Sequence, residues 1–494
     1  MPQKLEKDSY IYFQNKRTFI SAIIPDVMKH ILTIIVLLCT IPAYSQKTYF
    51  CSPNGKPTAE GTISSPVDFL TGLEKMSRAD TLYCRGGQYN LTNTIHFKNK
   101  DGFKGNNTVI MAYKNEKPIM DFRKQEYGKR GIMIESDNVH VKGLTIRYTG
   151  KNGLFNTGSY CIFENLDVYG NGDTGIQMKN GHSNLILNCD SHDNFDYKLK
   201  GIEAADFGGN ADGFADKQYY GGGNTYRGCR AWNNSDDGWD FYAHSTAYYG
   251  GTVIEDCICY NNGPEEYDVR KHARYETDKE WFDQFKGEGI DITDNDGQPG
   301  HVSLRHYTNY GNGNGFKLGG KRTVHNVTVK NCISIRNRVK GFDQNNNLGS
   351  MCLYNNTSYQ NGENYGFHNK ENGGKLAVRN SISIDGKRDD VLRTATTVHT
   401  NNSWDTSGIQ ATEADFKSVN HQKYVLAKRQ ADGSLPNTPL FHLTADSKLR
   451  NAGTYVGIPY SGDRPNIGTY EDGNVEKNDT DTIYSESFSE AISL

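Results

Sequence analysis

The chain has 494 residues, of which 52 are glycine, and only 35% are hydrophobic, which argues against a compact α/β domain with a large aliphatic core. Its 31 tyrosines, 21 phenylalanines and 4 tryptophans are too many for an intrinsically disordered chain. A formal net charge of −3 provides no basic field for a nucleic acid, so an acidic ligand must be held by a local group of residues.

The first element in chain order is a short basic segment followed by an apolar one. Residues 28–30, which begin with Met28, precede an apolar run at 31–44 that closes with a small-x-small cleavage pattern at 43–45. The run is too short to anchor the protein stably in a bilayer. The pattern predicts a cleaved signal peptide, a true start at Met28 with 1–27 as upstream sequence, and export to the periplasm or the exterior.

From residue 165 onward, one phrase recurs about every 22–25 residues, opening with a turn residue and a small or apolar one. Its copies are Asn165-Leu166, Asn188-Cys189, Gly228-Cys229, Asp256-Cys257, Asn331-Cys332, Asn356-Thr357 and Asn380-Ser381. A second phrase, glycine plus a bulky apolar residue, follows about ten residues later, as in Gly175-Ile176, Gly238-Trp239, Gly341-Phe342 and Gly366-Phe367. Short alternating strands with Gly and Asn turns at this period predict an all-β fold, a right-handed parallel β-helix.

The repeat also predicts what fills the core. The turn Asn can bond the backbone of the next coil through its side-chain amide, so a ladder of Asn residues is expected. The slot after it holds Cys, Leu, Thr or Ser, which indicates a small inward side chain. Stacked parallel side chains do not present the geometry that a disulfide needs, so we expect the cysteines to be core residues and not disulfides or metal ligands.

Two coils are longer than the period, and the excess falls near 195–211 and 263–288. Both stretches precede the second phrase, at Gly213-Phe214 and at Gly289-Ile290, so both loops should leave the cylinder at the same corner. They would then form the walls of a groove over the coil at 224–248, and long loops on a rigid scaffold usually carry function.

The chain therefore divides into four parts. Residues 1–45 are upstream sequence and signal peptide, and 46–386 form the β-helix, beginning with irregular coils and a capping segment. The periodicity fades after Gly386, so 387–473 are expected to form a cap of loops and short helices packed on the last coils. The polar stretch 474–494 is expected to be a tail.

The middle coils carry a cluster of acidic residues. Asp212 precedes the second phrase on one coil, Asp236 and Asp237 precede it on the next, and Asp240 follows closely. Stacked coils place these four carboxylates side by side at the surface, where they are expected to crowd together without a Lys or Arg between them. Such a cluster is stable mainly when a hard cation neutralises it, and all-oxygen ligands favour Ca²⁺.

Lys317 occupies the slot after the second phrase on a later coil, as Asp240 does on its own, and it lies among glycines at 313–320. A uronic acid has a weakly acidic C5 proton beside its carboxylate, and a cation bound to that carboxylate stabilises the carbanion. A lysine with a lowered pKa can remove this proton, after which the C4–O bond breaks by β-elimination.

The run at 210–242, which contains NADGFADK and NNSDDGWDFY, together with NGNGFKLGG at 312–320, resembles polysaccharide lyase family 9. These are secreted bacterial pectate or rhamnogalacturonan lyases with a pectin-lyase-like, single-stranded right-handed β-helix, and the resemblance spans about 47–471. It implies that Lys317 is the catalytic base. It also implies that the calcium ligands are Asp212, Asp236, Asp237 and Asp240.

In the family pattern the lysine segment follows the acidic coil more closely than it does here. The insertion at 263–288 and a further coil at 301–310 would place Lys317 two coil spacings, about 10 Å, from Asp240. Lys286, inside the insertion, is therefore the reserve candidate for the base. Lys217 is a candidate for binding a substrate carboxylate.

Two alternatives to a lyase remain open on the sequence alone. A uronate C5-epimerase would share the proton abstraction, and a non-catalytic glycan-binding β-helix would share the fold. The expected partner is an acidic plant polysaccharide, either polygalacturonate or rhamnogalacturonan I. The enlarged loops favour the bulkier rhamnogalacturonan I. We expect a monomer that spans no membrane and binds no nucleic acid.

Overall fold

The computed structural model describes residues 46–197, 208–217, 222–242, 250–264, 266–267, 274–280, 289–293, 299–303, 307–308, 311–371, 373–394, 396–405 and 409–471. The predicted signal peptide and the polar tail at 474–494 lie outside these ranges. Contacts divide the chain into Met1–Lys47 and Thr48–Leu494, and the description that follows concerns the second unit. Within the ranges above, no helix has both the length and the apolar character needed to cross a bilayer.

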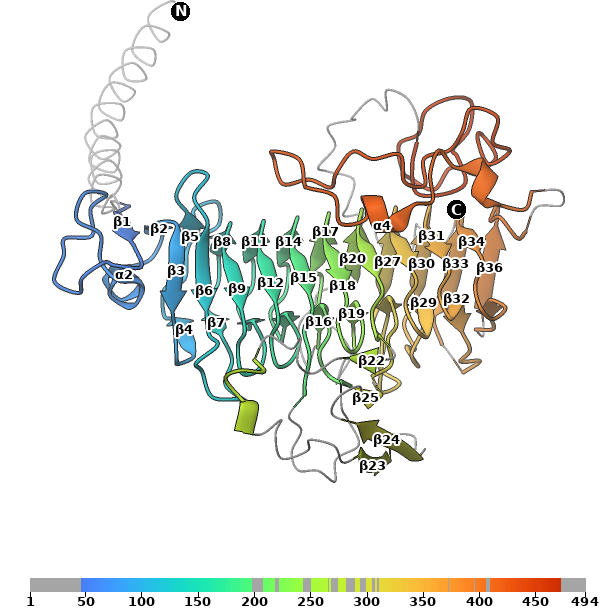
Figure 1. Cartoon of the computed structure of the whole chain (residues 1–494). Helices are drawn as coiled ribbons and strands as arrows, with labels where there is room; N and C mark the ends of the chain where they lie inside the picture. Colours follow the sequence, from blue (N-terminus) through green and yellow to red (C-terminus); the bar gives the residue numbers. More distant parts are fainter. Residues whose placement is uncertain are drawn as a thin grey trace, which may run out of the picture. The chain divides into compact units, whose positions relative to one another are not determined.

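Three long parallel sheets, through which the chain passes in the order sheet 1, sheet 2, sheet 3, make up the fold (Figure 1). The strands of sheet 1 are β1 (Thr48–Cys51), β2 (Thr81–Cys84), β5 (Thr108–Ala112), β8 (Val139–Lys142), β11 (Ile162–Glu164), β14 (Leu185–Leu187), β17 (Thr225–Arg227), β20 (Thr252–Glu255), β27 (Val327–Lys330), β30 (Met351–Tyr354), β33 (Lys375–Arg379) and β36 (Thr396–Thr400). The strands of sheet 2 are β3 (Gly87–Asn90), β6 (Pro118–Asp121), β9 (Thr145–Arg147), β12 (Asp167–Tyr169), β15 (Asp190–His192), β18 (Arg230–Trp232), β21 (Ile258–Tyr260), β28 (Ile333–Ile335), β31 (Thr357–Tyr359) and β34 (Ile382–Ile384). The strands of sheet 3 are β4 (Ile95–Lys98), β7 (Ile132–Glu135), β10 (Leu154–Asn156), β13 (Ile176–Met178), β16 (Phe214–Asp216), β19 (Trp239–Asp240), β26 (Phe316–Lys317), β29 (Lys340–Asp343), β32 (Glu363–Phe367) and β35 (Val391–Leu392). This is the right-handed parallel β-helix that the repeat predicts.

The turn residue of the first phrase has a left-handed backbone between sheet 1 and sheet 2. The φ angles are 53° at Asn165, 54° at Asn188 and 64° at Gly228, a region that Asn, Asp and Gly tolerate best. This explains why the phrase opens with these residue types. In the coil of β30 the left-handed residue is Asn355, so Asn356 and not Thr357 occupies the inward slot, one residue off the register expected from the sequence.

The core prediction for the cysteines is confirmed. Cys189, Cys229, Cys257 and Cys332 are fully buried and free, and the Cys229 N–H donates to the Cys257 sulfur at 3.4 Å. Beside them, the bulky residues of sheet 3 form a continuous aromatic stack. The successive ring-centroid separations in Phe214–Trp239–Phe316–Phe342–Tyr365 are 4.7, 4.8, 5.1 and 5.0 Å. Each such pair contributes about 0.5–1.5 kcal/mol beyond its buried area.

The asparagine ladder exists, but it runs six residues after the turn Asn, between sheet 2 and sheet 3. Its members are Asn171, Asn194, Asn234, Asn262, Asn337 and Asn361, all buried. Each side-chain Nδ2 donates to the Oδ1 of the next, at 2.8 or 2.9 Å. The sequence predicted the ladder at the turn residue itself. Asn is favoured at both positions, by the left-handed backbone at the turn and by the side-chain hydrogen bonds of the ladder.

Replacing one member of the ladder should destabilise the fold strongly. The Asn262 Oδ1 accepts from the N–H and the Nδ2 of Asn234, and the Asn262 Nδ2 donates to the Oδ1 of Asn337. Asn262→Ala leaves these buried groups short of partners, so we expect a loss of about 2–4 kcal/mol in the free energy of unfolding, measured by urea denaturation. The exposed Asn90→Ala should change it by less than about 0.5 kcal/mol. Equal effects from the two variants would contradict the role assigned to the ladder.

Both insertions join a strand of sheet 2 to a strand of sheet 3, from β15 to β16 and from β21 to β26, so they leave at the same corner as expected. The further coil expected at 301–310 is wrong. The second insertion contains a separate antiparallel sheet of β22 (Glu266–Tyr267), β25 (Tyr307–Thr308), β24 (Pro299–Ser303) and β23 (Gly289–Thr293). Gly289-Ile290 lies in β23 and is not a coil phrase. Glycine-punctuated alternation is common to a hairpin and a coil, which is why the sequence did not separate them.

Two smaller features lie outside the three sheets. Near the first strands, α2 (Phe69–Lys75) begins at Asp68, whose side chain accepts from the Thr71 N–H. The C-terminal segment 409–471, with η2 (Glu413–Asp415) and α4 (His421–Tyr424), lies along the outer side of sheet 2 (Figure 1). Its Phe416, Leu440 and Phe441 share a buried cluster with side chains of β21, β28, β31 and β34.

Candidate functional site

Apart from Lys286, the acidic and basic residues that the sequence singled out lie on, or within three residues of, three adjacent strands of sheet 3, β16, β19 and β26. Side chains alternate along each strand, so Trp239 and Phe316 enter the aromatic stack while Asp240 and Lys317 point away from it. β19 pairs directly with β26, and Asp240 lies opposite Lys317. The expected separation of two coil spacings is therefore wrong, because the second insertion contributes no coil between these strands.

Two lysines bridge three carboxylates. The Nζ of Lys217 lies 3.3 Å from Asp212 Oδ2 and 2.9 Å from Asp240 Oδ2. The Nζ of Lys317 lies 2.9 Å from Asp237 Oδ2 and 3.5 Å from Asp240 Oδ1. Asp240 therefore joins both lysines, and the expectation of an acidic cluster without cations between its members is corrected.

The cluster is also buried, although the sequence placed it at the surface of the cylinder. Asp212 and Asp237 have no exposed surface, Asp240 is 3% exposed and Lys317 is 6% exposed. Charged groups at this depth are stable only when they are paired or bind a metal ion. The site is therefore a preorganised charge network.

Asp236 lies outside the set of three carboxylates that the two lysines bridge. Its Oδ1 accepts a hydrogen bond from the Asn312 N–H, at the point where the chain returns from the second insertion. Asp237 has an equivalent bond, since its Oδ1 accepts from the Asn314 N–H at 2.7 Å. Lys286, the reserve candidate for the base, lies outside the described residues.

Burial and neighbouring charges shift the pKa values in opposite directions within the cluster. Burial raises the pKa of Asp212 to about 8, and the charges of Asp237 and Asp240 add to the rise. Burial acts on Asp240 as well, but the charges of Lys217 and Lys317 outweigh it and lower the pKa of that carboxyl. Burial disfavours the ammonium form of Lys317, yet Asp237 and Asp240 outweigh it and raise its pKa well above the usual range. With the protein's own charges alone, Lys317 is an ammonium at neutral pH.

The carboxylates fit the requirements of a hard cation. One oxygen from each of Asp212, Asp237 and Asp240 lies within 4.8 Å of the others, so these three residues can hold a metal ion. All the donors are oxygens, the set that Ca²⁺ prefers. Asp236 is not part of this group.

Tyr242 belongs to the site and was not singled out from the sequence. Its N–H donates to Asp240 Oδ1 at 2.9 Å, and its ring centroid lies 5.9 Å from the Nζ of Lys317 and 5.4 Å from that of Lys321. A side chain at Gly320 would collide with the ring, since an added Cβ would lie 2.3 Å from Tyr242 Cδ2. Gly320 therefore leaves room for this tyrosine, a signal that the sequence contained.

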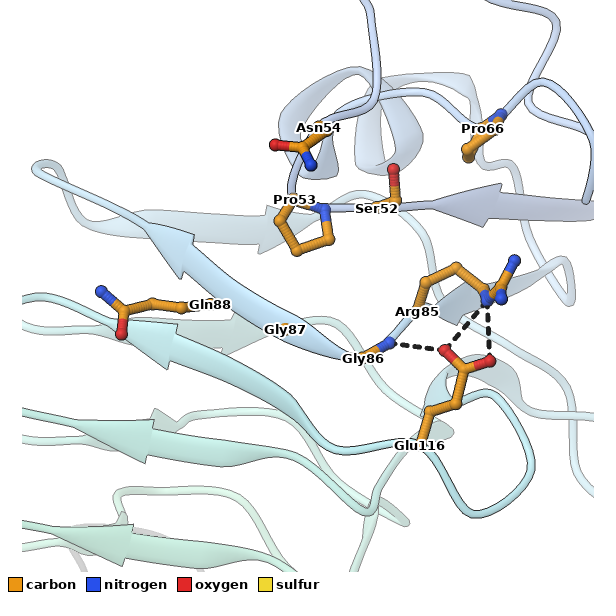
Figure 2. A pocket seen from close by; sticks show the side chains of 9 residues that line it. All are labelled: Ser52, Pro53, Asn54, Pro66, Arg85, Gly86, Gly87, Gln88 and Glu116. Atoms are coloured by element: carbon orange, nitrogen blue, oxygen red, sulfur yellow. Dashed lines mark hydrogen bonds and ion pairs between the residues drawn. The ribbon is translucent and has the colours of Figure 1, made fainter.

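A separate hollow of about 470 Å³ lies on the first coils, lined by Ser52, Pro53, Asn54, Pro66, Arg85, Gly86, Gly87, Gln88 and Glu116 (Figure 2). Its charged residues pair with each other, since Arg85 Nε lies 2.9 Å from Glu116 Oε2. None of the residues singled out in the sequence lines this hollow.

Comparisons with known proteins agree with the parallel β-helix fold. A protein-family model described as "Pel9A-like, right handed beta helix region" matches residues 49–381. Pectate lyase L of Dickeya chrysanthemi is 33% identical over 445 residues, which cover 86% of this chain and 91% of that protein. The crystal structure of pectate lyase Pel9A is similar with a TM-score of 0.69 and 31% identity, over 87% of this chain and 97% of that one. A rhamnogalacturonan lyase shares the fold, with a TM-score of 0.64 and 24% identity over 82% and 98% of the two chains.

Proposed function

Because the chain belongs to the Pel9A-like right-handed β-helix family, polysaccharide lyase family 9, and is therefore a polysaccharide lyase, we propose that it cleaves a galacturonate-containing pectic backbone by β-elimination. The observation that carries the proposal is the pairing of β19 with β26, which sets Lys317 opposite Asp240 and beside Asp237. The names of the relatives point to pectate as the substrate.

In this mechanism Lys317 is the Brønsted base that removes the C5 proton of a galacturonate unit. The carbanion then forms a C4=C5 double bond and expels the C4 oxygen, which takes up a proton from water and becomes the reducing end of one fragment, while the unsaturated sugar is the new non-reducing end of the other. The carboxylates of Asp237 and Asp240 pair with the amino group of Lys317 and fix the position of its Nζ atom. Tyr242 limits the space around that atom. Lys217 is the proposed contact for a substrate carboxylate.

We propose Asp212, Asp237 and Asp240 as the ligands of Ca²⁺ and assign Asp236 to holding the returning chain at Asn312. When bound, Ca²⁺ would supply Lewis-acid stabilisation of the substrate carboxylate and offset the carboxylate charge that keeps Lys317 protonated. Lys317 can act as a base only in its neutral form.

The experiment that tests the activity is incubation with polygalacturonate and with rhamnogalacturonan I in the presence of Ca²⁺. A lyase generates a product with an unsaturated uronate, which absorbs in the ultraviolet, whereas an epimerase or a binding protein does not. We expect ultraviolet absorbance to rise with at least one polymer, and the polymer that responds identifies the backbone. New reducing ends without absorbance would indicate hydrolysis and would refute the proposal.

Calcium affinity should depend steeply on pH. The raised pKa of Asp212, about 8, means that this carboxyl is protonated below that pH and must lose a proton to become a ligand. The apparent dissociation constant for Ca²⁺ should therefore rise by about tenfold per unit as the pH falls from 8 to 6. Calorimetry in buffers of different ionisation enthalpy would count the released protons. The same affinity at pH 6 and pH 8 would contradict the assignment of Asp212.

We also propose that the segment from Met28 to the cleavage pattern at 43–45 directs export of the protein. Sequencing the N-terminus of the protein recovered outside the cytoplasm tests this, and the expected first residue is Gln46. A recovered protein that still begins upstream of residue 43 would contradict it.

A further inference from the structure

Sheet 3 carries a further lysine, Lys340, that is held by a carboxylate close to Lys317. Lys317 on β26 lies opposite Asp343 on β29, the next strand of the sheet. The Nζ of Lys340, at the start of β29, lies 2.7 Å from Asp343 Oδ1. Neighbouring strands lie about 4.8 Å apart, so this ion pair begins one strand spacing from the proposed base. It lies on the opposite side of Lys317 from Lys217, which follows β16.

The aliphatic stem of Lys340 packs on the following strand. An added Cβ at Gly366 of β32 would lie 2.5 Å from Lys340 Cδ and 2.9 Å from its Cε, so a larger residue there would displace the stem. Gly366 is the strand partner of Asp343. The ammonium group therefore lies between β29 and β32, about 5–10 Å along the sheet from Lys317. The register partner of Lys340 itself, Glu363, forms an ion pair with His368 at 2.8 Å.

Hydrogen bonds connect this ion pair to the segment that carries Lys317. The Oδ1 of Asp343 also accepts from the Asn345 N–H at 3.1 Å. The Nδ2 of Asn345 donates at 2.7 Å to the carbonyl oxygen of Gly319, two residues after Lys317. The two lysines are therefore joined through one turn of the chain, which preorganises the separation of their amino groups.

Lys340 is the accessible member of its ion pair. Its side chain is 21% exposed, whereas that of Asp343 is 6% exposed. The pair therefore presents a cation to solvent above a buried carboxylate. A cation in this position can form a charge-assisted hydrogen bond with a carboxylate of the substrate while it keeps its own counterion.

We infer that Lys340 binds the carboxylate of the sugar next to the one from which Lys317 removes the proton, and that it thereby favours polygalacturonate over rhamnogalacturonan I. The inference rests on the proposed function, because it requires a pectic backbone that lies along sheet 3. Every sugar of polygalacturonate has a carboxylate. In rhamnogalacturonan I only every second sugar has one, so the neighbours of each galacturonate lack it. A cation placed one sugar away from Lys317 is therefore matched by the first polymer only.

The test compares steady-state rates on the two polymers, with Ca²⁺ present, for the wild type and Lys340→Met. Methionine keeps an aliphatic stem over Gly366 but lacks the charge. On polygalacturonate, Lys340→Met should lower kcat/KM about tenfold, mainly through KM, because one charge-assisted contact is lost. The ratio of kcat/KM for polygalacturonate to that for rhamnogalacturonan I should fall by the same factor. A purely structural ion pair would lower both values equally and leave the ratio unchanged.

Lys142→Met is the matched control, since the Nζ of Lys142 also lies 2.7 Å from a carboxylate oxygen, Glu164 Oε1, but on sheet 1. It should leave both values unchanged. The double variant of Lys340→Met with Asp343→Asn removes both charges of the pair, so no unpaired carboxylate is left buried. Its melting temperature should stay close to that of the wild type, and its ratio should also fall.

An unchanged ratio in either variant would overturn the inference, as would a wild type that acts on rhamnogalacturonan I alone. If the wild type acts on polygalacturonate alone, a tenfold higher KM in Lys340→Met but not in Lys142→Met supports the inference, and an unchanged KM overturns it. The absence of unsaturated product from both polymers would refute the proposed function itself, which is a different result from an unchanged ratio.

Discussion

Lys317→Ala should lower kcat by about three orders of magnitude, because a general base contributes about 10²–10⁴-fold to the rate of proton transfer. The proposed contact for the substrate carboxylate is a different side chain, Lys217, which keeps its pairs with Asp212 and Asp240 when Lys317 is removed. KM should therefore change little. Initial rates of formation of the unsaturated product, at several substrate concentrations, separate the two constants.

Lys317→Arg is the informative companion variant. It keeps a cation beside Asp237 and Asp240, so folding and the ion pairs persist, but a guanidinium cannot accept the proton. We expect it to be nearly as inactive as the alanine variant while its melting temperature stays close to that of the wild type. A rate above about a tenth of wild type in Lys317→Ala, together with an inactive Lys286→Ala, would transfer the role of base to the reserve candidate Lys286.

Asp240→Asn should abolish Ca²⁺-dependent activity and also destabilise the protein. This carboxylate contacts both Lys217 and Lys317, and its pKa is lowered because both ammoniums favour its charged form. Removing its charge leaves two buried cations undercompensated, which costs about 3–5 kcal/mol when a buried ion pair is broken. Thermal unfolding without Ca²⁺ and product formation with Ca²⁺ measure the two effects.

Two neighbouring carboxylates provide the contrast. Asp212→Asn should also abolish calcium binding, but it should destabilise the calcium-free protein less than Asp240→Asn does, because Asp212 pairs with one lysine and Asp240 with two. Asp236→Asn should retain calcium binding, since Asp236 lies outside the group of three carboxylates. A calcium affinity lost equally in Asp236→Asn would return this residue to the ligand set. Stability that rises in Asp240→Asn would contradict the ion-pair assignment.

The sequence predicted the coil architecture well because each coil repeats the same physical requirements. A left-handed turn needs Asn, Asp or Gly, as at Asn188 and Gly228, and an inward slot admits only small side chains such as Cys229. The register of a coil does not follow from the sequence where two adjacent residues could both occupy the turn position. At Asn355 and Asn356 the sequence offers two candidates for one turn position, and only the pairing of β28 with β31 decides between them.

For the candidate site, the sequence indicated which residues lie near one another better than it indicated the distances between them. Stacking places Asp212 and Asp240 near one another whatever the detailed backbone, because neighbouring coils are in register. The distance to Lys317 could not be predicted, since it depends on whether the intervening residues form a coil or leave the cylinder. The positions of Lys217 and Lys317 between the carboxylates also depend on side-chain conformation, which the repeat does not determine.

Among the described strand pairs of the β-helix, β19 and β26 join residues that are farthest apart in the sequence. Asp240 and Lys317 are 77 residues apart in the chain, whereas Ala215 and Asp240, also on paired strands, are 25 apart. The additional loop-closure entropy is only about 1 kcal/mol, so the insertion is inexpensive for equilibrium stability. Folding rates are more sensitive to such long-range pairings, and the coils on either side of the insertion can stack first from short-range contacts. The residues proposed for catalysis would then be brought together by the last step of folding, the joining of two half-solenoids. Pulse-labelling hydrogen exchange should find the amides of β19 and β26 protected later than those of β13 and β29, and simultaneous protection would exclude this order.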